Sequence, residues 1–317
     1  MKILLTGMGS IGKRHAQLLR ECSWDIDLIT YRSDSSKSRN SFNIPEYTEL
    51  EEALDTDPDI VFITNPTNQH IETALLCAKA GCDLFIEKPL SHDLENIDDL
   101  ISTVENRDLI TYIGCQLRFD PVLIAAQEKL QNEDLGDILS FRATSGSYLP
   151  DWRPESDYRE SYSADPDRGG GVVLDLIHEI DYSHWLFGPL QATSSEIGYT
   201  GTLEIDSEAL AEVLVRTSDD IIGSIHLDYC RRRPQRKLEV VCEDGTVIAD
   251  IHEQTLTLEY PSSTETEKFE YGRDRRFRSQ LEYFLEHVES RTLCENDIIE
   301  AKRVLQIALN IKGVIDE

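Results

Sequence analysis

The stretch Lys2-Ile3-Leu4-Leu5-Thr6-Gly7-Met8-Gly9-Ser10-Ile11-Gly12 opens the chain with an apolar run that leads into three glycines at the spacing GxGxxG. The apolar run predicts a strand over residues 2–6, and the following pattern predicts a helix over 11–20. A GxGxxG loop between a strand and a helix is typical of dinucleotide-binding folds. The alternative is a glycine-rich turn that binds no ligand.

Each glycine has a physical role in such a loop. Gly7 permits a tight turn, Gly9 lets the backbone approach a pyrophosphate, and Gly12 lets the helix pack on the strand. The N–H groups at the start of the helix, at Ser10 and Ile11, are then expected to hold the anion.

Strand-like and helix-like segments alternate through the first third of the chain. Such alternation is typical of a parallel sheet with crossover helices. We therefore predict an α/β fold whose N-terminal Rossmann domain, the dinucleotide-binding domain, covers residues 1–118. The further predicted strands cover 26–31, 60–64, 84–86 and 109–115, and the further helices cover 49–54, 69–80 and 94–105.

The pattern changes after Phe119-Asp120-Pro121. Residues 119–317 are predicted to form an α+β domain for substrate binding and oligomerisation, and the last helix is a candidate to pack back on the first domain. Alternating runs predict an antiparallel sheet. The predicted strands cover 138–148, 208–216, 221–229, 237–242, 247–251 and 255–260, the helices cover 122–130, 172–186, 275–288 and 297–314, and 149–168 is a polar stretch.

The composition excludes several classes of partner. Among 317 residues, 31 Lys and Arg stand against 60 Asp and Glu, a net charge of −29 that repels nucleic acid and anionic membranes. No apolar run reaches the roughly 18 residues of a membrane span, and the N-terminus does not resemble a signal peptide, so we expect a cytoplasmic protein. An acidic surface poor in lysine suits a salty cytoplasm, and an ordinary acidic enzyme is the equal alternative.

The cysteine and histidine patterns do not predict a metal site. Seven cysteines are scattered without a CxxC motif, which favours reduced thiols over disulfides or zinc. The basic run 231–237 is expected to pair with acidic neighbours or with a subunit, and a nucleic-acid patch is the alternative.

The end of the second strand indicates which dinucleotide binds. An acidic residue there would bind the ribose 2′-OH of NAD. Here Arg32 and Ser33 follow the strand, and both are suited to a 2′-phosphate. We predict NADP as the cofactor, with NAD as the alternative if Arg32 only stacks on the adenine.

Two further segments carry catalytic residue types. Lys88 follows the strand 84–86, and ligands of open α/β sheets bind at the carboxyl ends of strands. Three glycines, 169–171, precede Asp175 and His178, which share a face at a spacing of three if 172–186 is one helix. A carboxylate beside an imidazole orients the ring and stabilises its protonated form. A surface lysine and a surface Asp/His pair are the alternatives.

These motifs together resemble the Gfo/Idh/MocA oxidoreductases, the relatives of glucose-fructose oxidoreductase and inositol dehydrogenase. The resemblance covers essentially the whole chain and depends on the order and spacing of its motifs. The motifs are the GxGxxG loop, Glu87-Lys88-Pro89, the glycine-led Asp175 and His178, Thr64-Asn65-Pro66 with His70, Arg118-Phe119 with Pro121, and Arg236 ahead of a strand.

The resemblance implies an open, mostly antiparallel C-terminal sheet that forms a homodimer or homotetramer, and hydride transfer between NAD(P) and a sugar, polyol or nucleotide sugar. Lys88, Asp175 and His178 match the catalytic residues. The implied cofactor-binding residues are Gly7, Gly9, Ser10, Ile11, Gly12, Arg32, Ser33, Thr64, Asn65, Pro66, His70, Glu87, Lys88 and Gln116, and the candidate substrate-binding residues are Arg118, Tyr148, Trp152, Tyr158 and Tyr162.

One departure from the family pattern is informative. Many members space the Asp and His four apart, whereas Asp175 and His178 are three apart. The segment 148–163 is similar to a branch found with the biosynthesis of sialic-acid-like sugars, which also has the shorter spacing. Arg153, Arg159 and Arg168 in this region either favour an anionic substrate or pair with nearby acids.

The expected reaction is oxidation of an alcohol or its reverse. His178 takes the hydroxyl proton, Lys88 stabilises the reacting oxygen, and Asp175 holds the His178 tautomer. Lys88 as the base is an open alternative. A non-catalytic NADP-binding regulator, or a reductase related to dihydrodipicolinate or biliverdin reductase, would lack this combination of residues.

Overall fold

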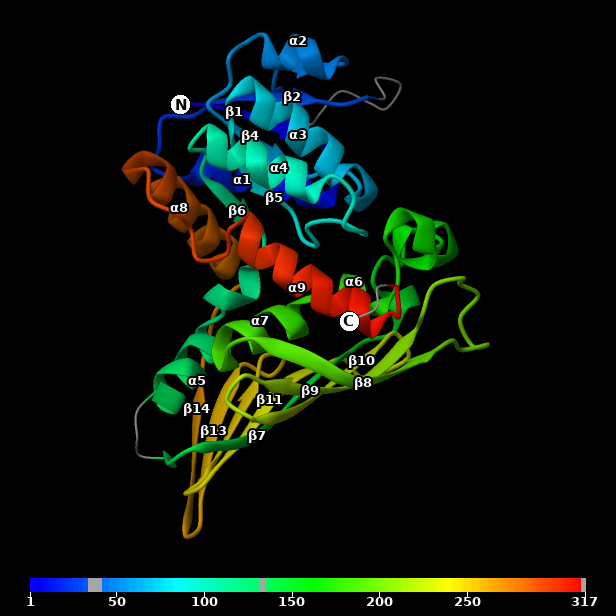
Figure 1. Ribbon diagram of the computed structural model, residues 1–317, viewed down its shortest axis with the longest axis vertical. Helices are drawn as coiled ribbons and strands as arrows, with labels where there is room; N and C mark the ends of the chain where they lie inside the picture. The colour runs from blue at the N-terminus through cyan, green and yellow to red at the C-terminus, as the bar shows by residue number, and fades with distance from the viewer. Residues whose placement is uncertain (34–41, 132–134, 315–317) are drawn as a thin grey trace. The chain divides into compact units, whose positions relative to one another are not determined.

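The computed structural model describes residues 1–33, 42–131 and 135–314 (Figure 1). The chain divides into two compact units. Unit 1 comprises residues 1–115 and 277–303, and unit 2 comprises 116–276 and 304–317.

Unit 1 is built on a six-stranded sheet in the order β3-β2-β1-β4-β5-β6. Every paired neighbour is parallel. The middle strands are fully buried, as expected for a parallel sheet covered on both faces. The predicted Rossmann fold is therefore confirmed. The strands are β1 (Lys2–Thr6), β2 (Asp27–Tyr31), β3 (Glu46–Tyr47), β4 (Ile60–Ile63), β5 (Asp83–Ile86) and β6 (Thr111–Ile113).

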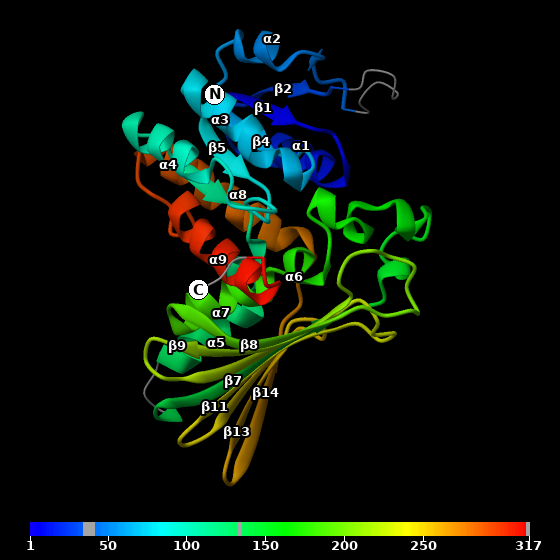
Figure 2. The same ribbon diagram turned by 45° about the vertical axis from the view of Figure 1, so that its right-hand side comes forward.

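Helices connect these strands. Helices α3 and α4 pack side by side (Figures 1 and 2), and α3 ends at Gly81, whose φ of +96° suits a helix C-terminus. The helices whose residues contribute to unit 1 are α1 (Ser10–Glu21), α2 (Leu50–Leu54), η1 (Thr67–Gln69), α3 (His70–Ala80), α4 (Ile97–Asn106), α8 (Asp274–Ser290) and the first part of α9 (Ile298–Ile311).

The division differs from the predicted domain boundary in one respect. The predicted boundary at 118/119 lies near the observed 115/116, but residues 277–303 group with unit 1. The reason is aromatic packing: Phe284 of α8 lies against Phe62 of β4 and Phe85 of β5, with ring centroids 6.0 and 5.6 Å apart. Helix α9 contributes residues to both units.

Unit 2 contains an eight-stranded sheet in the order β14-β13-β12-β11-β7-β10-β9-β8. Only the β7–β10 pair is parallel, so the predicted mostly antiparallel sheet is confirmed. Strands β8 and β14 were not predicted, because their polar sequences lack an apolar alternation. The strands are β7 (Ile138–Gly146), β8 (Leu190–Gly198), β9 (Leu210–Thr217), β10 (Ile222–Asp228), β11 (Gln235–Cys242), β12 (Thr246–Asp250), β13 (Thr255–Tyr260) and β14 (Ser263–Lys268).

Helices of unit 2 lie on one face of this sheet (Figures 1 and 2). Among the described residues, no helix lies on the other face. Burial alternates along β9 and β10, and Leu214 and Ile222 are at exposed positions of this pattern, each about half exposed. The helices are η2 (Gln116–Phe119), α5 (Pro121–Gln131), η4 (Leu149–Asp151), η5 (Tyr158–Glu160), η6 (Tyr162–Ala164), η7 (Pro166–Arg168), α6 (Val172–Asp175), α7 (His178–Phe187) and the last part of α9.

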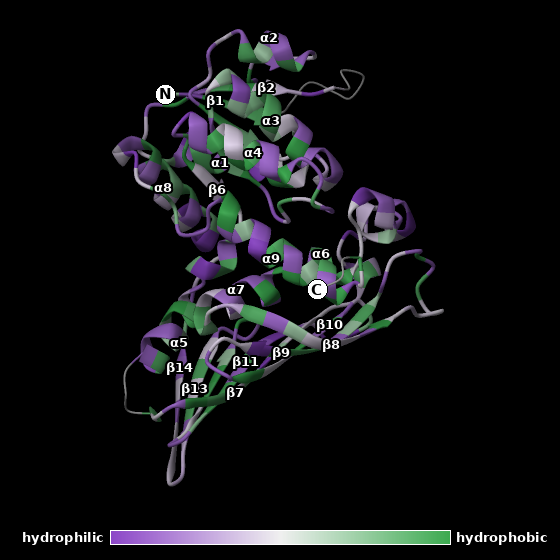
Figure 3. Ribbon diagram, viewed as in Figure 1, coloured by the Kyte–Doolittle hydropathy of each residue, from purple (hydrophilic) through white to green (hydrophobic). Residues whose placement is uncertain are grey.

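The hydropathy of the elements follows their burial. Apolar and polar residues alternate along α8 and α9, as in amphipathic helices (Figure 3). All seven cysteines are free thiols, and five of them are buried. In the described ranges, no helix is long and apolar enough to cross a membrane.

Candidate functional site

The glycine loop after β1 has the geometry that a dinucleotide requires. Gly7 has a φ of +115°, and a Cβ at Gly12 would lie 2.2 Å from the Gly7 carbonyl oxygen, so both positions require glycine. A Cβ at Gly9 would meet no described atom within 4 Å, so the approach to the loop is open. Helix α1 begins at Ser10 with no side-chain cap and no acidic residue in its first turn. These features fit a pyrophosphate at this helix start, where Ser10 is exposed and Ile11 half-buried.

The residues predicted to select the cofactor follow β2. Arg32 is half-buried, and its Nη1 lies 3.1 Å from Glu46 Oε2 on β3. Ser33 is exposed. An acidic side chain therefore already engages the arginine that was predicted to bind a 2′-phosphate.

The loop after β4 contacts the glycine loop directly. Thr64 Oγ1 donates a hydrogen bond to the Gly7 carbonyl oxygen at 3.0 Å. Asn65 Nδ2 donates to Thr73 Oγ1 at 2.8 Å, and Pro66 is exposed. The structure thus brings Thr64 to the phosphate loop through the backbone of Gly7.

His70, at the start of α3, joins the loops after β4 and β5. Its Nε2 lies 3.0 Å from the Asn65 carbonyl oxygen, and its Nδ1 lies 3.0 Å from that of Pro89. The ring is buried, and burial lowers the pKa of His70. The predicted cofactor-binding residue is therefore placed beneath the two loops, which it holds together.

The loop after β5 contains the predicted catalytic lysine. Lys88 is half-buried at the carboxyl end of β5, between buried Glu87 and buried Pro89. The Glu87 carboxylate lies 2.7 Å from Nε2 of His15 on α1. Sequence reasoning missed His15, because nothing in an amphipathic helix shows which buried residue meets a carboxylate 72 positions further on.

In unit 2, the predicted catalytic carboxylate lies among hydroxyl groups. The Tyr229 hydroxyl donates to Asp175 Oδ2 at 2.6 Å, and the Tyr162 hydroxyl also hydrogen-bonds Asp175. Burial raises the pKa of both tyrosines well above the ordinary value, and the nearby Asp175 charge adds to the effect. Tyr162 was predicted to bind substrate, whereas Tyr229 gave no sequence signal because it simply follows a strand.

The helix that was predicted over 172–186 is broken, so the argument that Asp175 and His178 share a helix face was wrong. Asp175 ends α6 and His178 begins α7, with Leu176 between them at φ −102° and ψ 31°. Both residues are buried. The glycine run has a steric reason: a Cβ at Gly171 would lie 2.2 Å from Glu208 Oε1, and one at Gly170 would lie 2.1 Å from a backbone oxygen.

One buried and one partly buried ion pair anchor α7. Arg118, predicted to bind substrate, binds Asp181 through Nε and Nη2, at 3.1 and 2.6 Å. Arg236 Nε lies 2.7 Å from Glu179 Oε1. Arg236 lies inside β11 rather than ahead of it. Both guanidinium groups therefore hold the helix that begins with His178. Gln116, predicted to bind the cofactor, is half-buried at the start of η2.

The predicted substrate segment is held by aromatic contacts. The Arg232 guanidinium lies 3.5 Å from the Tyr148 ring centroid. Trp152 donates from Nε1 to Ser147 Oγ at 2.7 Å, and its ring packs edge-on against Tyr229. Since Tyr229 binds Asp175, Trp152 is linked to the candidate catalytic residue through one intervening side chain, whereas Tyr162 of the same segment hydrogen-bonds it directly.

A small hollow in unit 2 is lined by Trp152, Tyr158 and Ser163, among others. The arginines near it are largely engaged. Arg159 pairs with Asp157 and Glu204, each at 2.6 Å, and Arg153 lies 5.7 Å from the Tyr162 ring centroid. Arg168 contacts the Glu160 carbonyl oxygen at 3.5 Å. For Arg159, the structure thus supports pairing with nearby acids.

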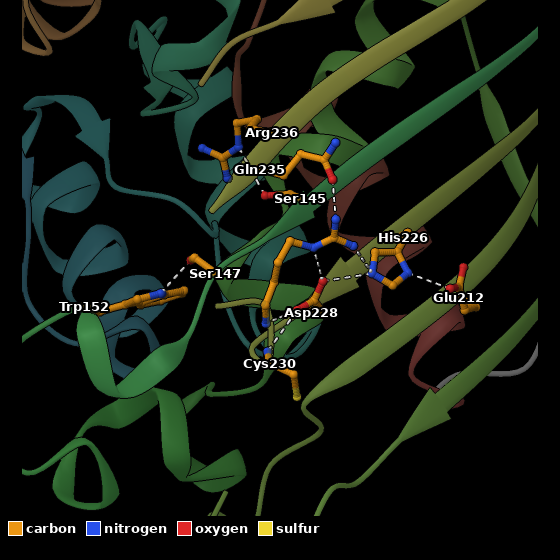
Figure 4. Close-up of polar contacts among 10 residues, drawn as sticks. Ser145, Ser147, Trp152, Glu212, His226, Asp228, Cys230, Gln235 and Arg236 are labelled. Atoms are coloured by element: carbon orange, nitrogen blue, oxygen red, sulfur yellow. Dashed lines mark hydrogen bonds and ion pairs between the residues drawn. The ribbon is translucent and has the colours of Figure 1, made fainter. Parts of the chain in front are cut away.

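Three arginines of the basic run 231–237 pair with acidic residues, as expected. Arg231 Nε lies 3.0 Å from Asp228 Oδ2, Arg233 lies 3.4 Å from Glu253, and Arg236 pairs with Glu179 as described above. The surroundings of Asp228 are drawn in Figure 4. His226 lies between Glu212 and Asp228, with ring nitrogens 2.5 and 2.9 Å from the two carboxylates. Burial opposes the charge of Asp228, but the hydrogen bonds from His226 and Arg231 outweigh it and lower the Asp228 pKa to about 2.

A glycine loop on a parallel sheet in one unit, and a buried carboxylate three residues before a buried histidine in the other, are the features expected of a two-unit dinucleotide-binding enzyme. In the described part of the chain, no group of three or more His, Cys, Asp or Glu is placed to hold a metal ion.

Comparison with known proteins identifies the family. The model of an oxidoreductase family with an NAD-binding Rossmann fold, Gfo/Idh/MocA, matches residues 1–115, and that of the Gfo/Idh/MocA C-terminal domain matches 123–248. The chain belongs to the Gfo/Idh/MocA oxidoreductases and is an NAD(P)-binding oxidoreductase, as the sequence motifs predicted.

Individual relatives match over nearly the full length. The chain is 27% identical to the myo-inositol 2-dehydrogenase of Thermotoga maritima, over 92% of this chain and 89% of that protein. It is 22% identical to the UDP-N-acetylglucosamine 3-dehydrogenase of Acidithiobacillus ferrooxidans, over 100% and 97%. A levoglucosan dehydrogenase in complex with NADH and levoglucosan shares the fold, with a TM-score of 0.88 at 17% identity over 99% and 96% of the chains.

Proposed function

We propose that this enzyme moves a hydride between nicotinamide and a hydroxyl or keto carbon of a sugar, polyol or nucleotide sugar. The observation that carries the proposal is the buried Asp175 carboxylate, which accepts hydrogen bonds from two tyrosine hydroxyls. Asp175 lies three residues before His178 in the sequence. The dehydrogenases to which the chain is similar act, by their names, on inositol and on a nucleotide sugar. The branch that makes sialic-acid-like sugars stays a prediction.

The residues have distinct roles in this reaction. His178 takes the hydroxyl proton during oxidation and returns it during reduction. Asp175 holds the orientation of the His178 ring, and the tyrosines that donate to Asp175 restrict that carboxylate in turn. Lys88 donates a hydrogen bond to the reacting oxygen and stabilises its developing charge. A bound nicotinamide supplies the hydride acceptor or donor. Lys88 as the base is the alternative assignment.

Aromatic residues of unit 2 are proposed to bind the substrate. Trp152 and Tyr158 line the hollow described above, and Tyr148 and Tyr162 belong to the same segment. Aromatic faces suit the apolar faces of sugar rings. Arg118 is proposed to act indirectly, because Asp181 holds its guanidinium.

We propose NADP as the preferred cofactor, with NAD as the second choice. Arg32 and Ser33 directly follow β2, where a 2′-phosphate would be recognised. Glu46 competes for Arg32 at 3.1 Å, so the expected preference is small.

We also propose that the sheet of unit 2 forms a homodimer or homotetramer. Leu214 and Ile222 on its open face are 51% and 52% exposed, and they lie diagonally across adjacent strands β9 and β10. The location is proposed to be the cytoplasm, where seven free cysteines stay reduced.

A substrate screen tests the proposed function. Purified enzyme is incubated with NADP or NAD and a panel of polyols, sugars and nucleotide sugars, and nicotinamide absorbance is followed in both directions. His178→Ala is the matched control, and a substrate is accepted only if the variant loses the signal. Full activity of His178→Ala on every active substrate would contradict the assignment.

A further inference from the structure

A buried histidine lies beneath the lysine loop of unit 1. His15 of α1 is fully buried, and its ring is surrounded by Phe62, Phe85 and Phe277, with centroids 5.3, 4.9 and 6.4 Å away. Among the described residues, its only polar contact joins Nε2 to Glu87 Oε1 at 2.7 Å. Nδ1 is buried and has no hydrogen-bond partner among the described residues.

These contacts select one form of the ring. With hydrogen on Nε2, the ring donates to the carboxylate, and the bare Nδ1 faces the apolar side. With hydrogen on Nδ1, a buried N–H would have no acceptor, and the Nε2 lone pair would face the carboxylate oxygen. The environment therefore favours the tautomer with hydrogen on Nε2.

Glu87 requires such a donor. Its side chain is 10% exposed and packs over Gly114, where a Cβ would lie 3.2 Å from Oε1. A buried carboxylate is stable only when it is hydrogen-bonded. His15 is the side chain that the structure places on it, at 2.7 Å.

The contact between His15 and Glu87 lies directly next to Lys88 in the chain. Glu87 directly precedes Lys88, and the carbonyl of Pro89, directly after it, contacts His70 Nδ1 at 3.0 Å. Both chain neighbours of Lys88 are thus anchored to buried histidine rings from two different helices, α1 and α3. Between these anchors, only Lys88 is half-buried.

We propose that His15 is a positioning residue for Lys88. Through its Nε2–H it fixes the Glu87 carboxylate, and with it the backbone from which Lys88 projects. The proposal rests on the proposed role of Lys88 in the reaction, and a purely structural core histidine is the alternative.

The first test compares two substitutions in the full-length enzyme. His15→Phe keeps the ring volume but removes the donor, whereas His15→Gln keeps an amide donor. We expect His15→Phe to lower kcat about 10- to 100-fold, with the Kd for NADPH within about threefold of wild type. His15→Gln should recover most of the loss. Equal kcat in His15→Phe and wild type would overturn the proposal, as would equal damage from both variants.

The second test does not depend on activity. In protein labelled with ¹⁵N-histidine, the His15 signals are assigned by their disappearance in His15→Gln, and their shifts report the tautomer. We expect hydrogen on Nε2 in wild type. Hydrogen on Nδ1 would overturn the proposal even if His15→Phe fails to fold.

The two proposals fail in distinguishable ways. If Lys88→Ala keeps full turnover, the proposed active site is wrong, whatever His15 does. If Lys88→Ala is inactive while His15→Phe loses only thermal stability, the role of Lys88 stands and His15 is merely structural.

Discussion

The two units hold their chemically important residues by different means. In unit 1 the backbone sets the loops, because Gly7 and Gly12 leave no room for side chains. In unit 2, side chains from distant segments meet at Asp175, which hydrogen-bonds the hydroxyls of Tyr162 and Tyr229. A backbone site therefore tolerates few substitutions at its glycines, whereas a side-chain site depends on individual hydroxyl and charged groups.

The largest effects are expected from substitutions that remove one candidate catalytic side chain from each unit. Lys88→Ala and His178→Ala should each lower turnover by about 10²–10⁴-fold, because each loses a group that we propose acts on the reacting oxygen or its proton. Cofactor affinity, measured by fluorescence titration, should remain nearly unchanged. Near-normal turnover in both variants on a confirmed substrate would remove both residues from the site.

Tyr229→Phe tests the side-chain construction of unit 2. The change leaves Asp175 without a donor at 2.6 Å, and hydrogen bonds to charged groups contribute about 1.5–3 kcal/mol to the free energy of unfolding. Tyr182→Phe is the matched control, because the buried Tyr182 hydroxyl has no hydrogen-bond partner among the described residues. Urea titrations should show a loss for the first variant and none for the second. Similar losses in both would mean that the packing of the buried hydroxyl, not its hydrogen bond to Asp175, matters.

Gly12→Ala and Gly9→Ala test the backbone construction of unit 1. A Cβ at Gly12 would lie 2.2 Å from a backbone oxygen, and such overpacking costs about 1–3 kcal/mol of the free energy of unfolding. A Cβ at Gly9 would meet no described atom within 4 Å, so Gly9→Ala should keep the melting temperature and weaken NADPH binding. Unchanged NADPH affinity in Gly9→Ala would contradict a pyrophosphate at this loop.

Arg32 sharpens the cofactor assignment in unit 1. NADPH should bind more tightly than NADH by about 1 kcal/mol, roughly fivefold, because Glu46 competes for the guanidinium. Arg32→Ala should abolish the difference, as measured by titration with both cofactors. Identical affinities in the wild type would reject the preference for NADP.

His226 tests charge pairing in unit 2 and has the smallest expected effect. The hydrogen bond to Asp228, with a further contribution from Glu212, raises the His226 pKa above its ordinary 6.5. Because the folded pKa exceeds the unfolded one, this stabilisation is complete below about pH 6.5 and is lost as the pH rises through the folded value. The melting temperature should therefore fall as the pH rises above about 6.5, and His226→Asn should flatten this decline. If the melting temperature of His226→Asn depends on pH as the wild type does, the His226–Asp228 pair does not cause the decline. Arg231, which also pairs with Asp228, is the other charged group next to His226.

Much of unit 1 could be predicted from local patterns. Apolar runs marked β1, β4 and β5, and the glycine spacing marked the phosphate loop, because a positive φ or a close backbone approach leaves few residues other than glycine. Lys88 could be placed because the carboxyl ends of parallel strands lie at one edge. The packing of α8 against the sheet of unit 1 could not be predicted, because the apolar face of α8 does not specify which aromatic residues it contacts.

The surroundings of the candidate catalytic residues in unit 2 show the opposite case. The sequence marked Asp175 and His178 as a pair, and a continuous helix was the natural expectation. The break at Leu176, the hydroxyls of Tyr162 and Tyr229, and the ion pair from Arg118 to Asp181 emerged only from the folded chain. Local patterns report the conformational preferences of a few adjacent residues, whereas these contacts join positions up to 63 residues apart and depend on how the sheet brings them together.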